Sequence, residues 1–152
     1  MKKQILPTLS LMAIGFLFVT GCKKDKAPAP PPPPTKTELI AKGPWKFDHA
    51  AIGTTDVSSQ VNACFKDNIA TFSATGNMEL DEATIVCSPS YAGTYTWVFQ
   101  SNETVLHLSA PIFTGGSSDF TLVSIDATNM VLSQVMTVSP YPPTTVTVTF
   151  KH

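Results

Sequence analysis

The sequence predicts an all-β domain of eight antiparallel strands, with one short helical turn in front of them. Three observations predict this class. Valine, threonine, phenylalanine and tyrosine alternate with polar residues in short runs, turn-forming residues separate these runs, and no amphipathic helical segment of useful length follows Pro44. Because the runs follow one another closely, we expect consecutive hairpins, which together form a meander.

The helical turn is expected at Thr37–Gly43. Thr35 or Thr37 is the candidate N-cap, and Gly43 is the candidate stop before Pro44. The alternation of apolar and polar residues then predicts the following strand ranges: 45–52, 68–74, 77–82, 92–99, 103–109, 118–125, 129–137 and 144–151.

Four groups of turn residues support the breaks between these strands. They are Thr75-Gly76-Asn77, Ser101-Asn102-Glu103, Gly115-Gly116-Ser117 and Asp126-Ala127-Thr128-Asn129. Eight strands in one open sheet would expose two edges, and closure into an up-and-down barrel removes both edges. A sandwich of two sheets would satisfy the same pattern.

Clean alternation in three strands indicates which side chains face inward. These are Tyr95, Trp97 and Phe99 in one strand, Leu106 and Leu108 in the next, and Val146, Val148 and Phe150 in the last, where Thr145, Thr147 and Thr149 take the other face. At eight strands, a barrel interior is just wide enough to be filled by side chains or to hold one small ligand.

The first residues have the layout of a secretion signal. Lys2 and Lys3 precede the apolar stretch 5–19, which is too short to span a bilayer comfortably. The following Val19-Thr20-Gly21-Cys22 resembles the bacterial lipobox. This resemblance implies cleavage of residues 1–21, acylation of Cys22 and a lipid tether of two or three chains, which gives stable membrane attachment without a spanning helix. A soluble exported protein is the alternative.

Composition limits the partners of the folded part. The segment 22–36 is a linker containing an unbroken Pro30–Pro34 run, for which we expect a semi-rigid polyproline II spacer. Residues 37–152 form one expected domain. They contain four lysines, no arginine and ten acidic residues, a net charge of −6, which excludes nucleic acid as the partner.

Cys64 and Cys87 are the two cysteines that remain once Cys22 is acylated. In a chain exported to an oxidising space we expect them to form a disulfide. Metal binding or thiol catalysis is the rival interpretation, although neither cysteine has a histidine near it in the sequence.

Catalytic groups are few in this sequence. His49 and His107 fall on predicted strands, and Glu79 and Asp81 are expected on a solvated strand face, so no nucleophile, base or metal constellation stands out. We therefore expect a protein that is not an enzyme and that uses no metal or cofactor.

Several short motifs follow one another along residues 37–152. They are Leu39, Gly43 and Trp45; Cys64, Asp67 and Asn68; Phe72 and Gly76; Cys87; and Gly93, Tyr95 and Trp97. Their order resembles that in the lipocalin-like domains of Bacteroidota lipoproteins. The resemblance implies an eight-stranded lipocalin-like barrel with Gly43 and Trp45 packed at its base. Lipocalins stack an arginine on this tryptophan, and the present chain has no arginine.

The resemblance also implies binding of a small apolar ligand in the barrel. The expected lining residues are Tyr95, Trp97, Phe99, Leu106 and Leu108. The alternative is a filled barrel that presents its loops to an envelope protein or a glycan. The residue after Cys22 is Lys23 rather than the aspartate that retains many enteric lipoproteins in the inner membrane, so we expect attachment to the outer membrane. Surface display in the resembling phylum usually follows an acidic cluster after the anchor, whereas Lys23-Lys24-Asp25-Lys26 is basic, so we expect the domain to face the periplasm.

Overall fold

The computed structural model describes residues 29–137 and 142–152, and residues 33–152 form one compact unit that contains every described strand and helix. The predicted signal peptide and Cys22 lie outside the described residues. None of the described helices is long and apolar enough to cross a membrane.

The short helix α1 (Lys36–Ile40) begins at Thr35, one of the two predicted caps. The Thr35 hydroxyl accepts a hydrogen bond from the Glu38 amide at 3.2 Å, and the Glu38 carboxylate accepts one from the Thr35 amide at 2.7 Å. This reciprocal capping box satisfies two amides that the helix leaves free. It also lowers the pKa of the Glu38 carboxyl. The helix ends at Ile40, three residues before the predicted stop at Gly43.

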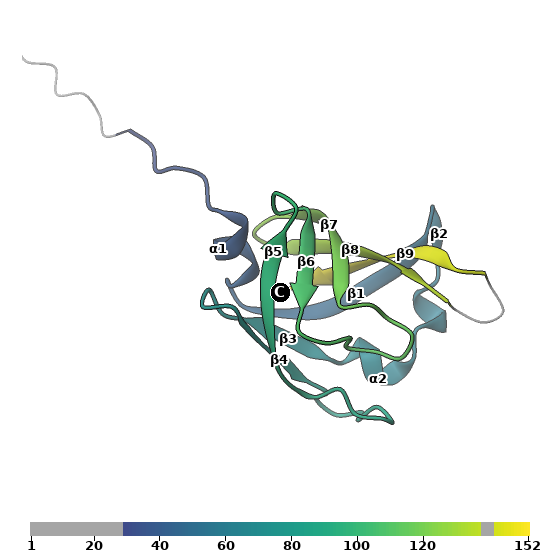
Figure 1. Ribbon diagram of the computed structural model, residues 1–152. Coiled ribbons are helices and arrows are strands. Elements are labelled where there is room, and N and C mark those ends of the chain that lie inside the picture. The colour runs from purple at the N-terminus through teal and green to yellow at the C-terminus, as the bar shows by residue number, and fades with distance from the viewer. Residues whose placement is uncertain (1–28, 138–141) are drawn as a thin grey trace, which may run out of the picture. The chain divides into compact units, whose positions relative to one another are not determined.

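Nine strands form one antiparallel sheet (Figure 1). They are β1 (Pro44–Ile52), β2 (Thr55–Asp56), β3 (Ile69–Phe72), β4 (Asn77–Asp81), β5 (Gly93–Gln100), β6 (Val105–Leu108), β7 (Asp119–Ile125), β8 (Asn129–Met136) and β9 (Thr144–Lys151). Pairing of β1 with β9 closes the sheet into a barrel-like ring, and the two-residue β2 extends β1 as a hairpin. The all-β prediction is confirmed, and the bounds of its eight strands agree with the observed bounds to within two residues.

The segment between β1 and β3 contains the elements that alternation did not predict. Besides β2, it holds a short 3-10 helix, η1 (Ser58–Gln60), and one turn of helix, α2 (Ala63–Lys66), which the Asn62 side chain caps through the Cys64 amide at 3.2 Å. None of these elements exceeds four residues, which is too short for a periodic pattern to appear in the sequence.

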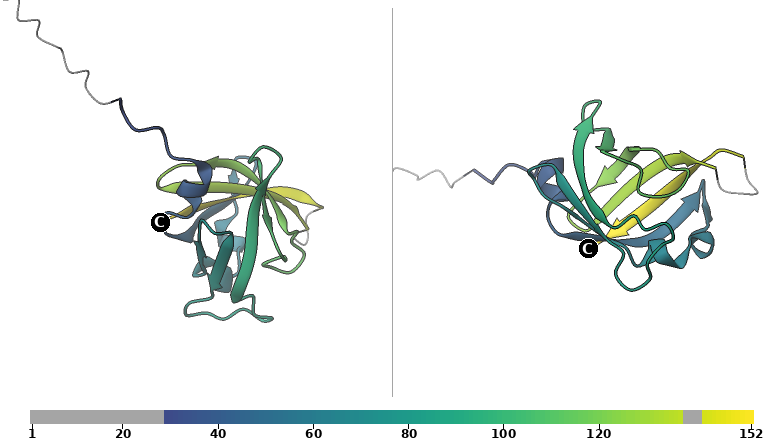
Figure 2. Two further views of the ribbon diagram at one scale, coloured as in Figure 1. Left: turned by 60° about the vertical axis from the view of Figure 1, so that its left-hand side comes forward. Right: turned by 60° about the horizontal axis from the view of Figure 1, so that its bottom comes forward.

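The connections alternate between the two ends of the ring because neighbouring strands are antiparallel. The hairpins after β3, β5 and β7 lie at the end that carries α1, where Lys36 Nζ donates a hydrogen bond to the Glu103 carbonyl oxygen at 2.8 Å. The segment 53–68 with α2, the loop 82–92 and the loop 109–118 lie at the other end. We call these the α1 end and the α2 end, and Figure 2 shows them at opposite sides of the ring.

Trp45 fills the α1 end. It is fully buried, and its indole Nε1 donates to the Ile40 carbonyl oxygen at 2.7 Å. The His152 imidazole covers the indole with ring centroids 3.9 Å apart, and its Nδ1 donates to the Pro44 carbonyl oxygen at 2.9 Å. A Cβ at Gly43 would lie only 3.3 Å from this imidazole, so the glycine makes room for His152. The expected packing role of Gly43 and Trp45 fits this geometry, with histidine covering the indole in a chain without arginine.

The interior side chains form two hydrophobic clusters. The first cluster is the larger and has Ile40, Trp45, Met78, Leu106, Leu108 and Met130 as its largest fully buried members. The second cluster contains Ala50, Val57 and Val146, with Phe47, Ile52, Val61, Met136 and Val148 packed against it. Each predicted inward residue belongs to one of the two clusters.

Thr149 was expected on the outer face with Thr145 and Thr147, yet it is only 8% exposed. A β-bulge interrupts the pairing of β1 with β9 between Phe47 and His49. Bulges re-aim neighbouring side chains, and here His49 Nε2 lies 3.3 Å from the Thr149 hydroxyl. Asp48 accepts a hydrogen bond from His49 Nδ1 at 2.8 Å and pairs with Lys151 Nζ at 3.0 Å, and both contacts hold the pKa of its carboxyl low.

Candidate functional site

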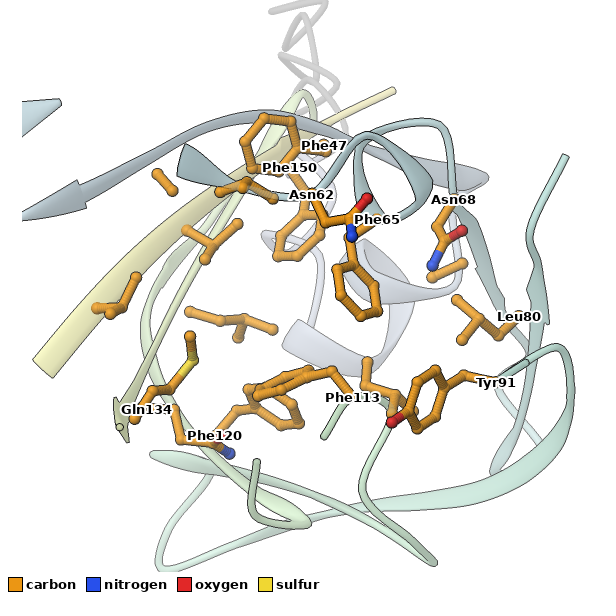
Figure 3. A pocket seen from close by; sticks show the side chains of 18 of the residues that line it. Phe47, Asn62, Phe65, Asn68, Leu80, Tyr91, Phe113, Phe120, Gln134 and Phe150 are labelled. Carbon is orange, nitrogen blue, oxygen red and sulfur yellow. The ribbon is translucent and has the colours of Figure 1, made fainter. Parts of the chain in front are cut away.

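A cavity of about 590 Å³ lies inside the ring and extends to the α2 end (Figure 3). Every member of the second cluster lines it, and so do most members of the first cluster. The two clusters are therefore separated by space rather than packed into one core. The volume of the cavity falls within the range of small-molecule sites in proteins, about 300–1,000 Å³.

Alternation along the strands supplies the cavity wall. In β4, β6 and β8 every second residue is buried, which places the following side chains on the inner face: Met78 and Leu80, Leu106 and Leu108, and Met130 and Leu132. Period-two burial is what antiparallel strands show when one face meets an apolar interior. The wall is therefore fixed by the same pattern that predicts the strands.

Three aromatic side chains, one from α2 and two from different loops, lie near one another at the α2 end (Figure 3). Phe65 of α2 lies 6.0 Å from Tyr91 and 6.4 Å from Phe113, measured between ring centroids. The Tyr91 hydroxyl forms a hydrogen bond with the Thr114 hydroxyl, which joins loop 82–92 to loop 109–118. A Cβ at Gly116 would collide with the Phe113 ring, so Gly116 permits the position that Phe113 takes.

The predicted disulfide between Cys64 and Cys87 is present, with the two Cα atoms 5.2 Å apart. Both cysteines are buried and both line the cavity. Because Cys64 belongs to α2 and Cys87 to loop 82–92, the bond ties together two of the segments that surround the α2 end of the cavity.

Two carboxylates accept hydrogen bonds from residues of loop 82–92. Glu82 is 3% exposed and accepts hydrogen bonds from the Tyr91 amide at 2.7 Å and the Ser90 hydroxyl at 2.8 Å. The Tyr91 amide is the main reason why the pKa of Glu82 lies below its ordinary value. Asp67 accepts hydrogen bonds from the Thr84 and Ile85 amides at 3.1 and 2.8 Å. Ionised acceptors strengthen such bonds, so both carboxylates order the loop.

Only part of the predicted ligand-binding set reaches the cavity. Leu106 and Leu108 line it, whereas Tyr95, Trp97 and Phe99 do not and belong to the neighbouring first cluster. The Trp97 indole is turned to the hairpin after β3, where its Nε1 donates to the Ser73 and Asn77 carbonyl oxygens at 3.1 and 3.2 Å. The Tyr95 hydroxyl donates to the Tyr91 carbonyl oxygen at 2.6 Å, and burial raises its pKa.

Most aromatic lining residues were not singled out from the sequence. Phe150 was expected to face inward, and it lines the cavity. Phe65, Tyr91 and Phe113 lie outside the strands, so no alternation marks them. The Cys64 motif next to Phe65 was the one available signal for this region.

The polar groups of the cavity wall are uncharged side chains. Gln134 is 8% exposed. Its side-chain amide accepts a hydrogen bond from the Ser117 amide at 3.0 Å and donates to the Ser117 and Asp119 carbonyl oxygens at 2.9 and 2.7 Å. Asn68 Oδ1 is buried and has no hydrogen-bond partner within the described part of the chain. Asn62 and Gln60 also line the cavity.

The two strand histidines lie apart from this cavity. His107 Nδ1 donates to Asp119 at 2.6 Å, and His49 pairs with Asp48; none of the four residues lines the cavity. Across residues 29–137 and 142–152, no group of three or more histidine, cysteine or acidic side chains is placed to hold a metal ion.

The arrangement described above is an apolar cavity with an uncharged polar margin and loops held by a disulfide and two carboxylates. No protein-family model matches the chain, and no curated protein matches its sequence.

Proposed function

We propose that the chain is a lipid-anchored envelope protein whose lipocalin-like domain binds a small apolar ligand inside the ring. The observation that carries this proposal is the cavity of about 590 Å³ with its mainly aliphatic and aromatic wall. Apolar burial contributes about 25 cal/mol per Å², so a ligand burying about 200 Å² of apolar surface gains about 5 kcal/mol before the cost of immobilisation. No catalytic step is part of the proposed function.

The tether in this proposal is Cys22. It rests on the Val19-Thr20-Gly21-Cys22 motif after the apolar stretch 5–19, and the Cys64–Cys87 disulfide is consistent with export to an oxidising compartment. We place the protein at the outer membrane with the domain facing the periplasm. Labelling with radioactive palmitate should mark the wild-type chain and leave Cys22→Ser unmarked, and equal labelling of both would contradict the tether.

Ligand binding is tested first with protein purified without detergent. Native mass spectrometry should show a population that is heavier than the apoprotein and that loses the extra mass on denaturation. Consistent purification of the bare mass, together with failure to take up added apolar ligands, would contradict the proposal.

A matched pair of variants tests whether the ligand occupies this cavity. Val148 lines the cavity, whereas Val123 is 57% exposed and does not line it. Val148→Trp should fill the space and weaken ligand binding by about tenfold or more, and Val123→Trp should leave binding unchanged. Circular dichroism of both variants checks that the fold is retained. Equal binding by Val148→Trp would place the ligand elsewhere.

A further inference from the structure

The charge of the cavity wall bears on which apolar molecules fit. Among residues 29–137 and 142–152, none that lines the cavity is an aspartate, glutamate, lysine or histidine, and the chain contains no arginine. The wall therefore offers no counter-charge to a buried ion. Moving an unpaired carboxylate or ammonium out of water is unfavourable even after local relaxation, so a charged ligand would lose much of what its apolar part gains.

The surroundings of the cavity disfavour anions further. Asp67 and Glu82 hold loop 82–92 at the α2 end, and their hydrogen bonds are made to backbone amides and to the Ser90 hydroxyl rather than to a cation. Residues 37–152 carry a net charge of −6. A negatively charged ligand would therefore approach against the field of the domain.

Uncharged hydrogen-bonding groups are nevertheless present on the wall. Gln60, Asn62 and Asn68 come from the segment 53–68 at the α2 end, and Figure 3 shows the Asn62 and Asn68 amides among the lining side chains. Side-chain amides can both donate and accept hydrogen bonds, so they match a hydroxyl, ketone or amide group. The deep wall, by contrast, is built from side chains such as Met130 and Leu132.

We propose that the cavity selects uncharged amphiphiles: molecules with an apolar body in the ring and one neutral hydrogen-bonding group at the α2 end. The inference rests on the proposed ligand-binding function and specifies the chemical class of its ligand. Long-chain alcohols, ketones and amides belong to this class, whereas fatty acids and other anionic amphiphiles of the same length do not.

Two fluorescent probes with the same ring skeleton test the selection. N-phenylnaphthylamine is uncharged, and anilinonaphthalenesulfonate adds one sulfonate. Titration of residues 33–152, the compact unit, at neutral pH should give binding of the uncharged probe at least about tenfold tighter. Dodecanol should displace the bound probe at concentrations at which dodecanoate does not.

Two glutamine substitutions test whether the missing counter-charge is the cause. Gln60 lines the cavity, and Gln100 ends β5 at the α1 end; both are exposed. Gln60→Lys should improve binding of the sulfonate probe severalfold, and Gln100→Lys, with the same change in net charge, should not.

The outcomes separate this inference from the function on which it rests. Equal binding of both probes, or equal displacement by dodecanol and dodecanoate, overturns the selection and leaves ligand binding in place. An equal effect of the two lysine variants also overturns it, because the domain field rather than the cavity wall would then set the preference. Failure of both probes to bind overturns the ligand-binding function as well.

Discussion

The His152 imidazole stacks on the buried indole of Trp45, with ring centroids 3.9 Å apart and an angle of 32° between the ring planes. The contact joins the residue after β9 to the second residue of β1, and the pairing of these two strands closes the ring. The seal of the α1 end and the closure of the ring are therefore stabilised by the same pair of residues.

A double-mutant cycle measures this contact. Trp45→Ala removes a fully buried side chain and should lower the free energy of unfolding by about 3–5 kcal/mol. His152→Ala should cost less, and the coupling between the two should be about 0.5–1.5 kcal/mol, the value of an aromatic pair. Urea unfolding followed by circular dichroism gives all three numbers. The control is His107→Ala, on the outer face, which should show no coupling to Trp45; additive effects of Trp45→Ala and His152→Ala would contradict the role of the stacking.

Removal of the disulfide should affect stability and ligand binding together. The bond closes a loop with a sequence separation of 23 residues, which corresponds to about 3 kcal/mol on the chain-entropy model. The double substitution of Cys64→Ala and Cys87→Ala should lower the free energy of unfolding by roughly this amount and weaken binding of the uncharged probe, because both cysteines line the cavity. An unchanged urea midpoint would show that the fold does not depend on the bond. Dithiothreitol should reproduce the effect in the wild type and have none in the variant.

Substitution of Glu82 should lower stability and weaken ligand binding, whereas substitution of Glu79 should not. Glu82→Ala leaves the Tyr91 amide and the Ser90 hydroxyl without their buried acceptor, so we expect a lower urea midpoint and weaker ligand binding. Glu79→Ala, at an exposed position on β4, should change neither property. If the two variants behaved alike, the proposed ordering of loop 82–92 by Glu82 would be wrong.

Asp126 should contribute to a loss of stability in acid. In the hairpin between β7 and β8 its carboxylate accepts hydrogen bonds from the Thr128 and Asn129 amides at 2.7 and 2.8 Å, which lowers its pKa to about 2. Because the pKa is depressed in the folded state, the contribution is present above the ordinary aspartate value of about 4 and is lost as the pH falls toward 2. Asp126→Asn should therefore differ from the wild type in its unfolding midpoint near neutral pH, and the difference should shrink between pH 4 and pH 2. A difference independent of pH would contradict this assignment.

The strands of the ring were predictable because alternation and turn residues mark them within their own local sequence. Val146, Val148 and Phe150 alternate with threonines, and Thr75, Gly76 and Asn77 mark a turn, so these elements follow from local sequence. The choice between Thr35 and Thr37 as helix cap could also have been made, because Thr35 and Glu38 have the spacing of a capping box.

The residues that shape the cavity depend instead on contacts between distant segments. Glu82 is buried and accepts a hydrogen bond from the Tyr91 amide in loop 82–92, and Thr149 is buried opposite the β-bulge between Phe47 and His49. Phe65 and Phe113 sit in segments without periodicity, so nothing local indicates that they meet. The inward position of Trp97 was predicted correctly. Its indole nevertheless points away from the cavity and donates hydrogen bonds to two carbonyl oxygens of a hairpin.

The pairing of β1 with β9 also has a consequence for how the chain is made. His49 and Thr149 are 100 residues apart in sequence, so the barrel cannot close while the ribosome is still adding the residues of β9. Closure over so long a separation makes folding slow, and the apolar inner face stays accessible until the last strand arrives. Until β9 has paired with β1, this exposed inner face can associate with apolar surfaces of other chains, so aggregation competes with closure during this interval.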